Sequence, residues 1–178
     1  DIAAAGTATV DVITTGAAST SNTQTFTINA ASSPLITLTP TSLTGFTYIA
    51  GSGPSGTQSF SVSGANLTGA PGNIVVTAPA DYEINNGSGW VTTFNIPYAT
   101  ATLGATNVDV RLKAGLAVGT YNTELISVAG GGDSKNETVS GNVTLGTPVA
   151  NAATVFTATS FTADWVAVPG ASAGYLLD

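Results

Sequence analysis

The heptapeptide NVDVRLK, residues 107–113, alternates strictly between apolar and polar side chains. Successive side chains of a β-strand point to opposite faces, so a period of two predicts a strand with one buried face. A helix would instead repeat its apolar positions every three to four residues. The buried face is expected to carry Val108, Val110 and Leu112, and the solvent face Asp109, Arg111 and Lys113.

Shorter runs of the same kind recur between Leu35 and Leu145, separated by Gly, Pro and Asn turn signals. Their spacing is typical of an all-β sandwich, and no helical periodicity accompanies them. Leu125 and Ile126 are adjacent, which predicts either a bulge or a strand covered on both faces. The expected strands are 35–39, 46–50, 57–63, 74–78, 82–85, 91–96, 108–113, 121–128 and 137–144.

The two flanks of this central set contain too few strands to close a sandwich. Residues 7–14 and 23–29 predict one hairpin, and two strands alone are marginal in water. Residues 159–178 open a strand, turn at Pro169-Gly170 and begin another strand at Tyr175. We therefore expect a window from a longer chain of sandwiches: the last strands of one domain in 1–33, a complete domain in 34–146 and the first strands of another in 147–178.

Composition narrows the classes of partner. Charged residues make up 7% of the 178 residues, the net charge is −7, and the only cations are Arg111, Lys113 and Lys135. Clustered cations are needed to neutralise phosphates, so no nucleic-acid partner is expected. No stretch approaches the roughly 20 continuous apolar residues of a membrane helix, so no membrane insertion is expected. Cysteine and histidine are absent, which removes disulfides and the usual zinc ligands.

Two glycine motifs match enzyme patterns but lack the surrounding structure. Gly51–Gly56, GSGPSG, fits the dinucleotide fingerprint, yet a strand pattern follows it where a helix is needed to hold phosphate. Gly170–Gly174, GASAG, fits the nucleophile elbow around Ser172, but the chain has no histidine to act as its base. Both are interpreted as loops, and no catalytic or cofactor-binding residue is predicted.

Carboxylates and aromatic rings supply the remaining candidate site residues. Asp81, Glu83 and Asp133 are candidate calcium ligands, because calcium binds carboxylate oxygens. They are weak candidates, since the dense D-x-D-x-D spacing of a calcium-binding loop is missing. The alternative is that they are solvated acids. A cluster of aromatic residues predicts either core or end-cap packing or a stacking platform for glycans. That cluster contains Tyr82, Trp90, Phe94 and Tyr98.

Residues 147–178, TPVANAATVFTATSFTADWVAVPGASAGYLLD, resemble the start of a fibronectin type III domain, with Trp165 at the place of its strand-B tryptophan and Tyr175 where strand C begins. The loop GASAG is slightly longer than the usual form. Residues 35–145 are similar to immunoglobulin-like modules of large secreted proteins of the Bacteroidota, often exported by the type IX system. The matching stretches are SGTQSFSVSGANLTG, APADYEINNGSGW, VDVRLKAGLAVGTYNTELISVAGGG and NETVSGNVT.

The resemblance implies a non-catalytic spacer at the bacterial cell surface, such as an adhesin stalk, whose partners are neighbouring modules. Tyr121, two residues after Gly119, would then act as a tyrosine corner. Two alternatives stay open. One is a carbohydrate-binding or accessory module of a secreted hydrolase that contacts surface glycans. The other is a filament subunit whose incomplete sandwiches accept strands from other copies.

Overall fold

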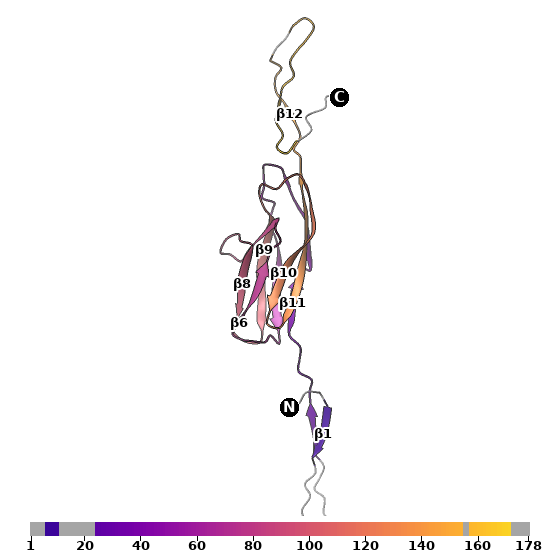
Figure 1. The fold of residues 1–178 in the computed structure, drawn as a ribbon, viewed down its shortest axis with the longest axis vertical. Coiled ribbons are helices and arrows are strands. Elements are labelled where there is room, and N and C mark those ends of the chain that lie inside the picture. Colours follow the sequence, from indigo (N-terminus) through magenta and orange to yellow (C-terminus); the bar gives the residue numbers. More distant parts are fainter. Residues whose placement is uncertain (1–5, 11–23, 155–156, 172–178) are drawn as a thin grey trace, which may run out of the picture. The chain divides into compact units, whose positions relative to one another are not determined.

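The computed structural model describes residues 6–10, 24–154 and 157–171 (Figure 1). These residues form strands, turns and loops without any helix, which confirms the predicted all-β class. Within the same ranges there is accordingly no helix long and apolar enough to span a membrane. The chain divides into two compact units, residues 1–33 and 34–178.

The first unit contains the predicted hairpin. Strand β1 (Gly6–Val10) pairs antiparallel with β2 (Gln24–Ile28), and the register runs from Gly6 opposite Ile28 to Val10 opposite Gln24. Thr25 and Thr27 are exposed, as the alternation TQTFTI predicts. The rest of the predicted strand 7–14 lies outside the described residues.

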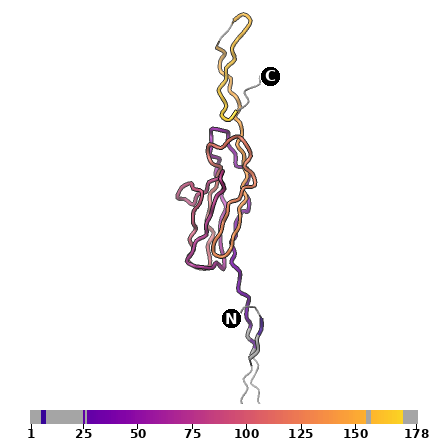
Figure 2. Tube along the Cα trace, in the orientation of Figure 1, coloured from indigo at the N-terminus to yellow at the C-terminus, as the bar shows by residue number. Residues whose placement is uncertain are grey.

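The second unit contains a sandwich of two sheets (Figure 1, Figure 2). One sheet has four strands in the order β3-β5-β9-β7, and the other has five in the order β4-β11-β10-β6-β8. Its strands are β3 (Leu35–Thr39), β4 (Ser42–Ile49), β5 (Gln58–Ala65), β6 (Gly72–Thr77), β7 (Tyr82–Asn85), β8 (Thr93–Tyr98), β9 (Leu103–Leu112), β10 (Gly119–Gly130) and β11 (Asp133–Thr144).

The first edge of the sandwich changes sheets. Strand β3 pairs antiparallel with β5, and after Pro40 and Thr41 the chain continues as β4, which pairs in parallel with β11 in the other sheet. The parallel register runs from Ser42 opposite Thr138 to Ile49 opposite Thr144. One continuous segment therefore supplies an edge strand to each of the two sheets.

The core lies between the two sheets and is formed by the inward residue of each alternating pair. Phe46 and Tyr82 pack edge to face within it, with ring centroids 5.5 Å apart. Burying each large apolar side chain contributes about 1.5–3 kcal/mol. The predicted inward residues of NVDVRLK, Val108, Val110 and Leu112, are all fully buried. The alternation thus correctly identifies the core face of β9.

The structure resolves the irregularity around Leu125. Its side chain is 49% exposed whereas Ile126 is fully buried, so this strand is not covered on both faces. The bulge alternative is correct, but the register shift lies just upstream, between Tyr121 and Glu124. Gly51–Gly56 forms the predicted loop, and it leads into strand β5.

After the sandwich, the described residues 147–154 and 157–171 contain one short strand pair. Strand β12 (Val149–Ala150) pairs with β13 (Trp165–Val166), so Trp165 lies on a strand. Val149, Phe161 and Val166 are 61%, 67% and 53% exposed, so these three side chains bury little of their apolar surface. The predicted strand at Tyr175 and most of the GASAG loop lie outside the described residues.

Candidate functional site

Trp90 is the best candidate for surface recognition, and a cross-strand ion pair positions it. Arg111 of β9 lies opposite Glu83 of β7 in the antiparallel ladder, and its Nε atom is 2.6 Å from Glu83 Oε1. The Arg111 guanidinium carbon lies 3.9 Å from the centroid of the Trp90 ring, a cation–π stack. One face of the indole is thereby covered, and the side chain is half-buried.

The loop before Trp90 is held by its own side chains. Asn85 Oδ1 accepts hydrogen bonds from the backbone N–H groups of Gly87 (2.7 Å) and Gly89 (3.0 Å). Both glycines have positive φ, which residues with a side chain adopt at a cost. After the loop, the backbones of Ile84 and Val91 exchange two hydrogen bonds of 2.9 Å. This pair closes the loop and protects the outer edge of β7.

The four aromatic residues of the cluster do not share one surface. Tyr82 is fully buried, and its hydroxyl donates a 2.8 Å hydrogen bond to the carbonyl of Tyr121. Tyr98 is 6% exposed and donates to the carbonyl of Thr68 at 2.7 Å, while Phe94 packs against the core. Tyr82 and Tyr98 belong to the core and Phe94 is partly buried against it, whereas the Trp90 ring stacks on Arg111.

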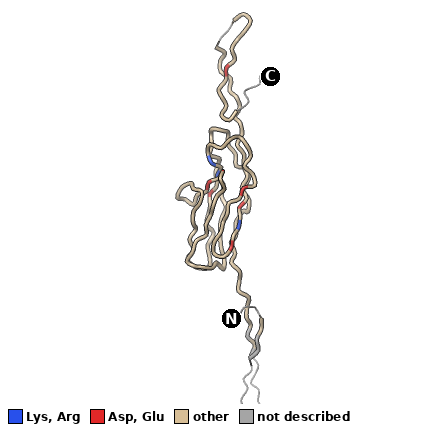
Figure 3. The backbone as a smooth tube through the Cα atoms, viewed as in Figure 1, with Lys and Arg blue, Asp and Glu red and all other residues tan. Residues whose placement is uncertain are grey.

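The candidate calcium ligands are separated in the fold. Glu83 is paired with Arg111, and Asp133 lies on β11 where it binds backbone amides. Asp81 lies beside Glu124 of β10; burial and, next, the Asp81 charge raise the pKa of Glu124. In the described part of the chain, no three acidic side chains approach closely enough to hold a metal ion. Figure 3 shows how sparsely the charged residues are placed along the backbone.

Asp133 joins the two sheets. Its Oδ2 atom accepts a 2.7 Å hydrogen bond from the backbone N–H of Ile36, and Oδ1 accepts one of 2.8 Å from Ser134. Lys135 Nζ lies 3.1 Å from Oδ2. The hydrogen bond from Ile36, more than the other contacts, lowers the pKa of Asp133. Its carboxylate thus anchors the first strand of the sandwich to the tip of the β10–β11 hairpin.

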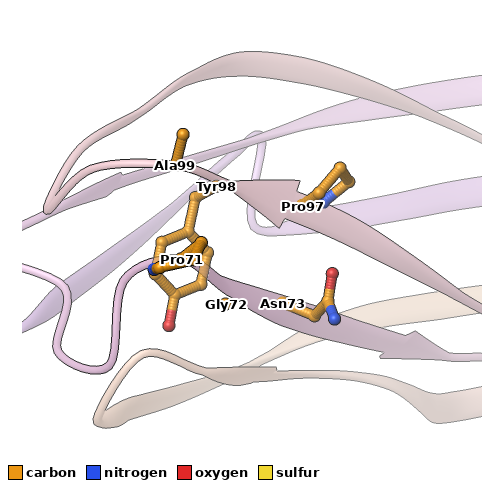
Figure 4. A pocket seen from close by; sticks show the side chains of 6 residues that line it. All are labelled: Pro71, Gly72, Asn73, Pro97, Tyr98 and Ala99. Atoms are coloured by element: carbon orange, nitrogen blue, oxygen red, sulfur yellow. The ribbon is translucent and has the colours of Figure 1, made fainter.

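A hollow of about 470 Å³ lies at one end of the five-stranded sheet (Figure 4). Pro71 and Pro97 line it together with Tyr98, from the ends of β6 and β8. The remaining lining residues are Gly72, Asn73 and Ala99. None of these side chains is an acid, a base or an activated nucleophile, and the Tyr98 hydroxyl is engaged by Thr68. The hollow offers apolar contact and no acid–base chemistry.

Sequence reasoning missed one buried acid, Glu137 of β11. Its side chain is fully buried, and neither carboxyl oxygen has a hydrogen-bond partner among the described residues. Burial raises its pKa to about 7. The sequence ETVSGNV, residues 137–143, does predict this burial, because alternation places Glu137 on the same face of the strand as Val139 and Val143.

No protein-family model matches the chain, and no curated protein is significantly similar to it. The fold defines the class, an all-β sandwich protein.

Proposed function

We propose that the chain is a non-catalytic spacer segment of a long extracellular bacterial surface protein. The observation that carries this proposal is the path of the chain through the sandwich. Ile36, next to the start of β3, is hydrogen-bonded to Asp133 at the start of β11, whereas the end of β4 lies beside the end of β11. The chain therefore enters at one end and leaves at the other.

This path gives each such module a defined length. Strand β11 has 12 residues, and a strand rises about 3.3 Å per residue, so one module separates its neighbours by about 40 Å. Opposed ends suit a spacer, because they hold the modules before and after it apart.

We further propose that residues 34–146 are an immunoglobulin-like module. Strands β3, β5, β9 and β7 follow the order A-B-E-D of that fold, and β11, β10 and β6 follow G-F-C. Strands β4 and β8 add one edge strand each to the second sheet. Tyr121, near the start of β10, donates from its hydroxyl to the carbonyl of Ala117 at 2.7 Å, the contact of a tyrosine corner. The chain lacks the cysteine pair and β6 lacks the tryptophan of antibody domains.

The same proposal includes a cell-surface location, export by the type IX system and a fibronectin type III-like start in 147–178. These three parts rest on the resemblance of the sequence to such modules. The exposed Val149 and Val166 support further strands packing on the strand pair β12–β13, because a two-stranded pair with exposed apolar side chains is stabilised by a cover.

Replacement of the module tests the spacer role directly. Residues 34–146 of the parent protein are exchanged for an unrelated sandwich of the same length, and surface attachment is measured in the producing cell. We expect the replacement to restore attachment that deletion of the module abolishes. Rescue that requires this particular sequence would contradict the spacer role and favour specific binding.

The half-exposed Trp90 favours a second function, glycan binding by an accessory module of a secreted hydrolase. An indole face can stack on a sugar ring, although Arg111 already covers one face here. A glycan array with the whole chain would show binding that Trp90→Ala abolishes and Val91→Ala, at the next position in the sequence, retains. A blank array would remove this alternative.

The exposed strand pair at 147–171 favours the third candidate, a filament in which another copy supplies the missing strands. The mass of the native polypeptide separates this from the spacer. A mature chain of about 17.5 kDa that forms long polymers would support the filament. A much heavier single polypeptide would support the spacer.

A further inference from the structure

We propose that β8 is a self-association edge, at which two copies of the chain pair antiparallel and join their five-stranded sheets. Strand β8 is the last strand of that sheet and, within the described residues, pairs only with β6 (Figure 1). An edge strand carries a row of unpaired backbone N–H and C=O groups, to which another strand can add. The proposal goes beyond the spacer role and takes only its biological setting from it.

The direction of each backbone group in β8 follows from its pairing with β6. The carbonyl of Thr92, just before the strand, accepts a 2.8 Å hydrogen bond from the Ala78 amide. In an antiparallel pair, residues two apart direct their backbone groups to the same side. Phe94 and Ile96 therefore bond to β6 with both their N–H and their C=O groups.

The residues between them direct their backbone groups to the open edge. Thr93 and Asn95 each present an N–H and a carbonyl there, and Pro97 presents a carbonyl alone. Within sheets, proline occupies edge positions whose nitrogen faces solvent, so Pro97 agrees with this assignment. The open edge of β8 thus offers two donors and three acceptors.

This row of groups is complementary to itself. When Asn95 lies opposite Asn95 of an antiparallel second copy, the two residues exchange a pair of N–H···O=C bonds. Thr93 of each copy then lies opposite Pro97 of the other, and its amide donates to the proline carbonyl. All outward donors of both copies are bonded in this register, and only the Thr93 carbonyls lack a partner. The contact is the same from both sides, so it closes as a two-fold dimer.

The other three edge strands are partly occupied. Each has a backbone group that is already hydrogen-bonded by a residue outside its own sheet. On β7 the partner is the backbone of Val91. On β3 the Ile36 amide donates to Asp133, and on β4 the Thr44 carbonyl accepts from Gln58. Among the described residues, no such contact covers the Thr93 or Asn95 backbone, so β8 is the edge that is free to pair.

No charge protects this edge. Strand β8, TFNIPY, and its neighbour β6, GNIVVT, contain no charged residue. Many proteins place lysine or another charge on an edge strand, which prevents pairing with a second copy. The net charge of −7 on each copy still repels at long range, and salt screens that repulsion. We therefore expect the dimer to tighten as ionic strength rises.

The apolar hollow of about 470 Å³ adjoins the same edge, since Pro97 of β8 is part of its lining (Figure 4). In the proposed register, Thr93 of the second copy lies opposite Pro97. The start of the second copy's β8 therefore lies beside the hollow. Covering its apolar lining stabilises the pair.

The two-fold symmetry fixes the relative direction of the two chains. Antiparallel pairing of β8 with itself turns the second sandwich end for end. In the setting of the proposed spacer, the paired chains run in opposite directions, as stalks that project from two facing cells do. The edge would join such stalks side by side.

Sedimentation equilibrium of the whole chain tests the association itself. We expect a reversible monomer–dimer equilibrium that approaches twice 17.5 kDa at high concentration and tightens with added salt. A chain that stays monomeric at millimolar concentration would overturn the proposal. Open-ended polymers would overturn it too, and would favour the filament in which copies donate strands.

A charge swap at Asn95 tests the register. Asn95→Lys and Asn95→Asp should each weaken the dimer about fivefold, because like charges would lie directly opposite each other. An equal mixture of the two variants should restore association. Thr47→Lys and Thr47→Asp are the controls: Thr47 is exposed on β4, the other edge strand of the sheet, and these variants carry the same net charges. Equal sensitivity at both positions, or none at Asn95, would overturn the β8 pairing.

Hydrogen exchange of the wild type gives a readout that needs no substitution. The amides of Phe94 and Ile96 should be protected at every concentration, because they bond to β6. Those of Thr93 and Asn95 should become protected only as the dimer forms. Protection of these two amides that does not change with concentration would overturn the pairing at this edge, while leaving the spacer role, tested by module replacement, untouched.

Discussion

Glu137 lies opposite Ile126 in the β10–β11 ladder, with its carboxyl group inside the apolar core. No donor in the described ranges reaches either oxygen. Ionisation would place an unpaired charge there, so burial raises its pKa from 4.5 to about 7. A neutral carboxylic acid is the form that the folded protein holds at mildly acidic pH.

This burial makes stability depend on pH. The unfolded chain loses the Glu137 proton near its ordinary pKa, whereas the folded chain keeps it until about pH 7. The contribution of Glu137 to the free energy of unfolding is therefore largest at low pH. It falls by about 3 kcal/mol in all as pH rises through the pKa of the folded state. Glu137→Gln should therefore be more stable than the wild type at pH 8 and similar to it at pH 4.5. Urea denaturation across this range measures it, and a pH-independent difference would contradict the prediction.

Asp133 and Ile36 are 97 residues apart in the sequence, yet one hydrogen bond joins them. Asp133→Ala should speed hydrogen exchange of the Ile36 amide about tenfold, because the amide loses its charged acceptor. Asp109→Ala, on the outer face of β9, is the control and should leave this amide unchanged. In the wild type, protection should persist at neutral pH and be lost as pH falls through the lowered pKa of Asp133. Exchange that is equal in both variants would show that the bond contributes nothing.

The strands were predictable because alternation is a local property. Residues 35–39 and 82–85 form strands with the predicted boundaries, and the other expected strands differ by a few residues. Turn signals explain this accuracy, since Gly or Pro occurs in nearly every connection between strands. Pairing is not local: nothing near Ser42 in the sequence indicates that β4 runs parallel to β11.

The candidate sites were less predictable for the same reason. Tyr82 and Trp90 are eight residues apart and both aromatic, but one is fully buried and the other stacks on Arg111. Glu83 was a candidate metal ligand, and its neighbour across the sheet is Arg111. Neither outcome can be read from spacing, because each depends on a strand that returns later in the chain.

Gly141 of β11 is tightly packed against its neighbours. A Cβ atom there would lie 2.6 Å from the Phe46 carbonyl oxygen and 2.7 Å from Leu112 Cδ1. Gly141→Ala should thus destabilise the sandwich by about 1–3 kcal/mol, the cost of overpacking. Gly104→Ala is the control, because its Cβ would meet nothing within 4 Å. Urea denaturation measures both, and equal stabilities would show that β4 and β11 separate easily.

Thr123 holds a strained backbone in the β10 bulge. Its φ is 57°, a left-handed conformation that is costly for a β-branched residue. The fold tolerates it because the Thr123 amide donates to Ser140 Oγ at 3.0 Å, a bond that any residue except proline retains. Thr123→Gly should therefore raise the free energy of unfolding by about 1 kcal/mol. Thr120→Gly, earlier in the same strand, should lower it, and a loss of stability in both variants would show that the bulge is not strained.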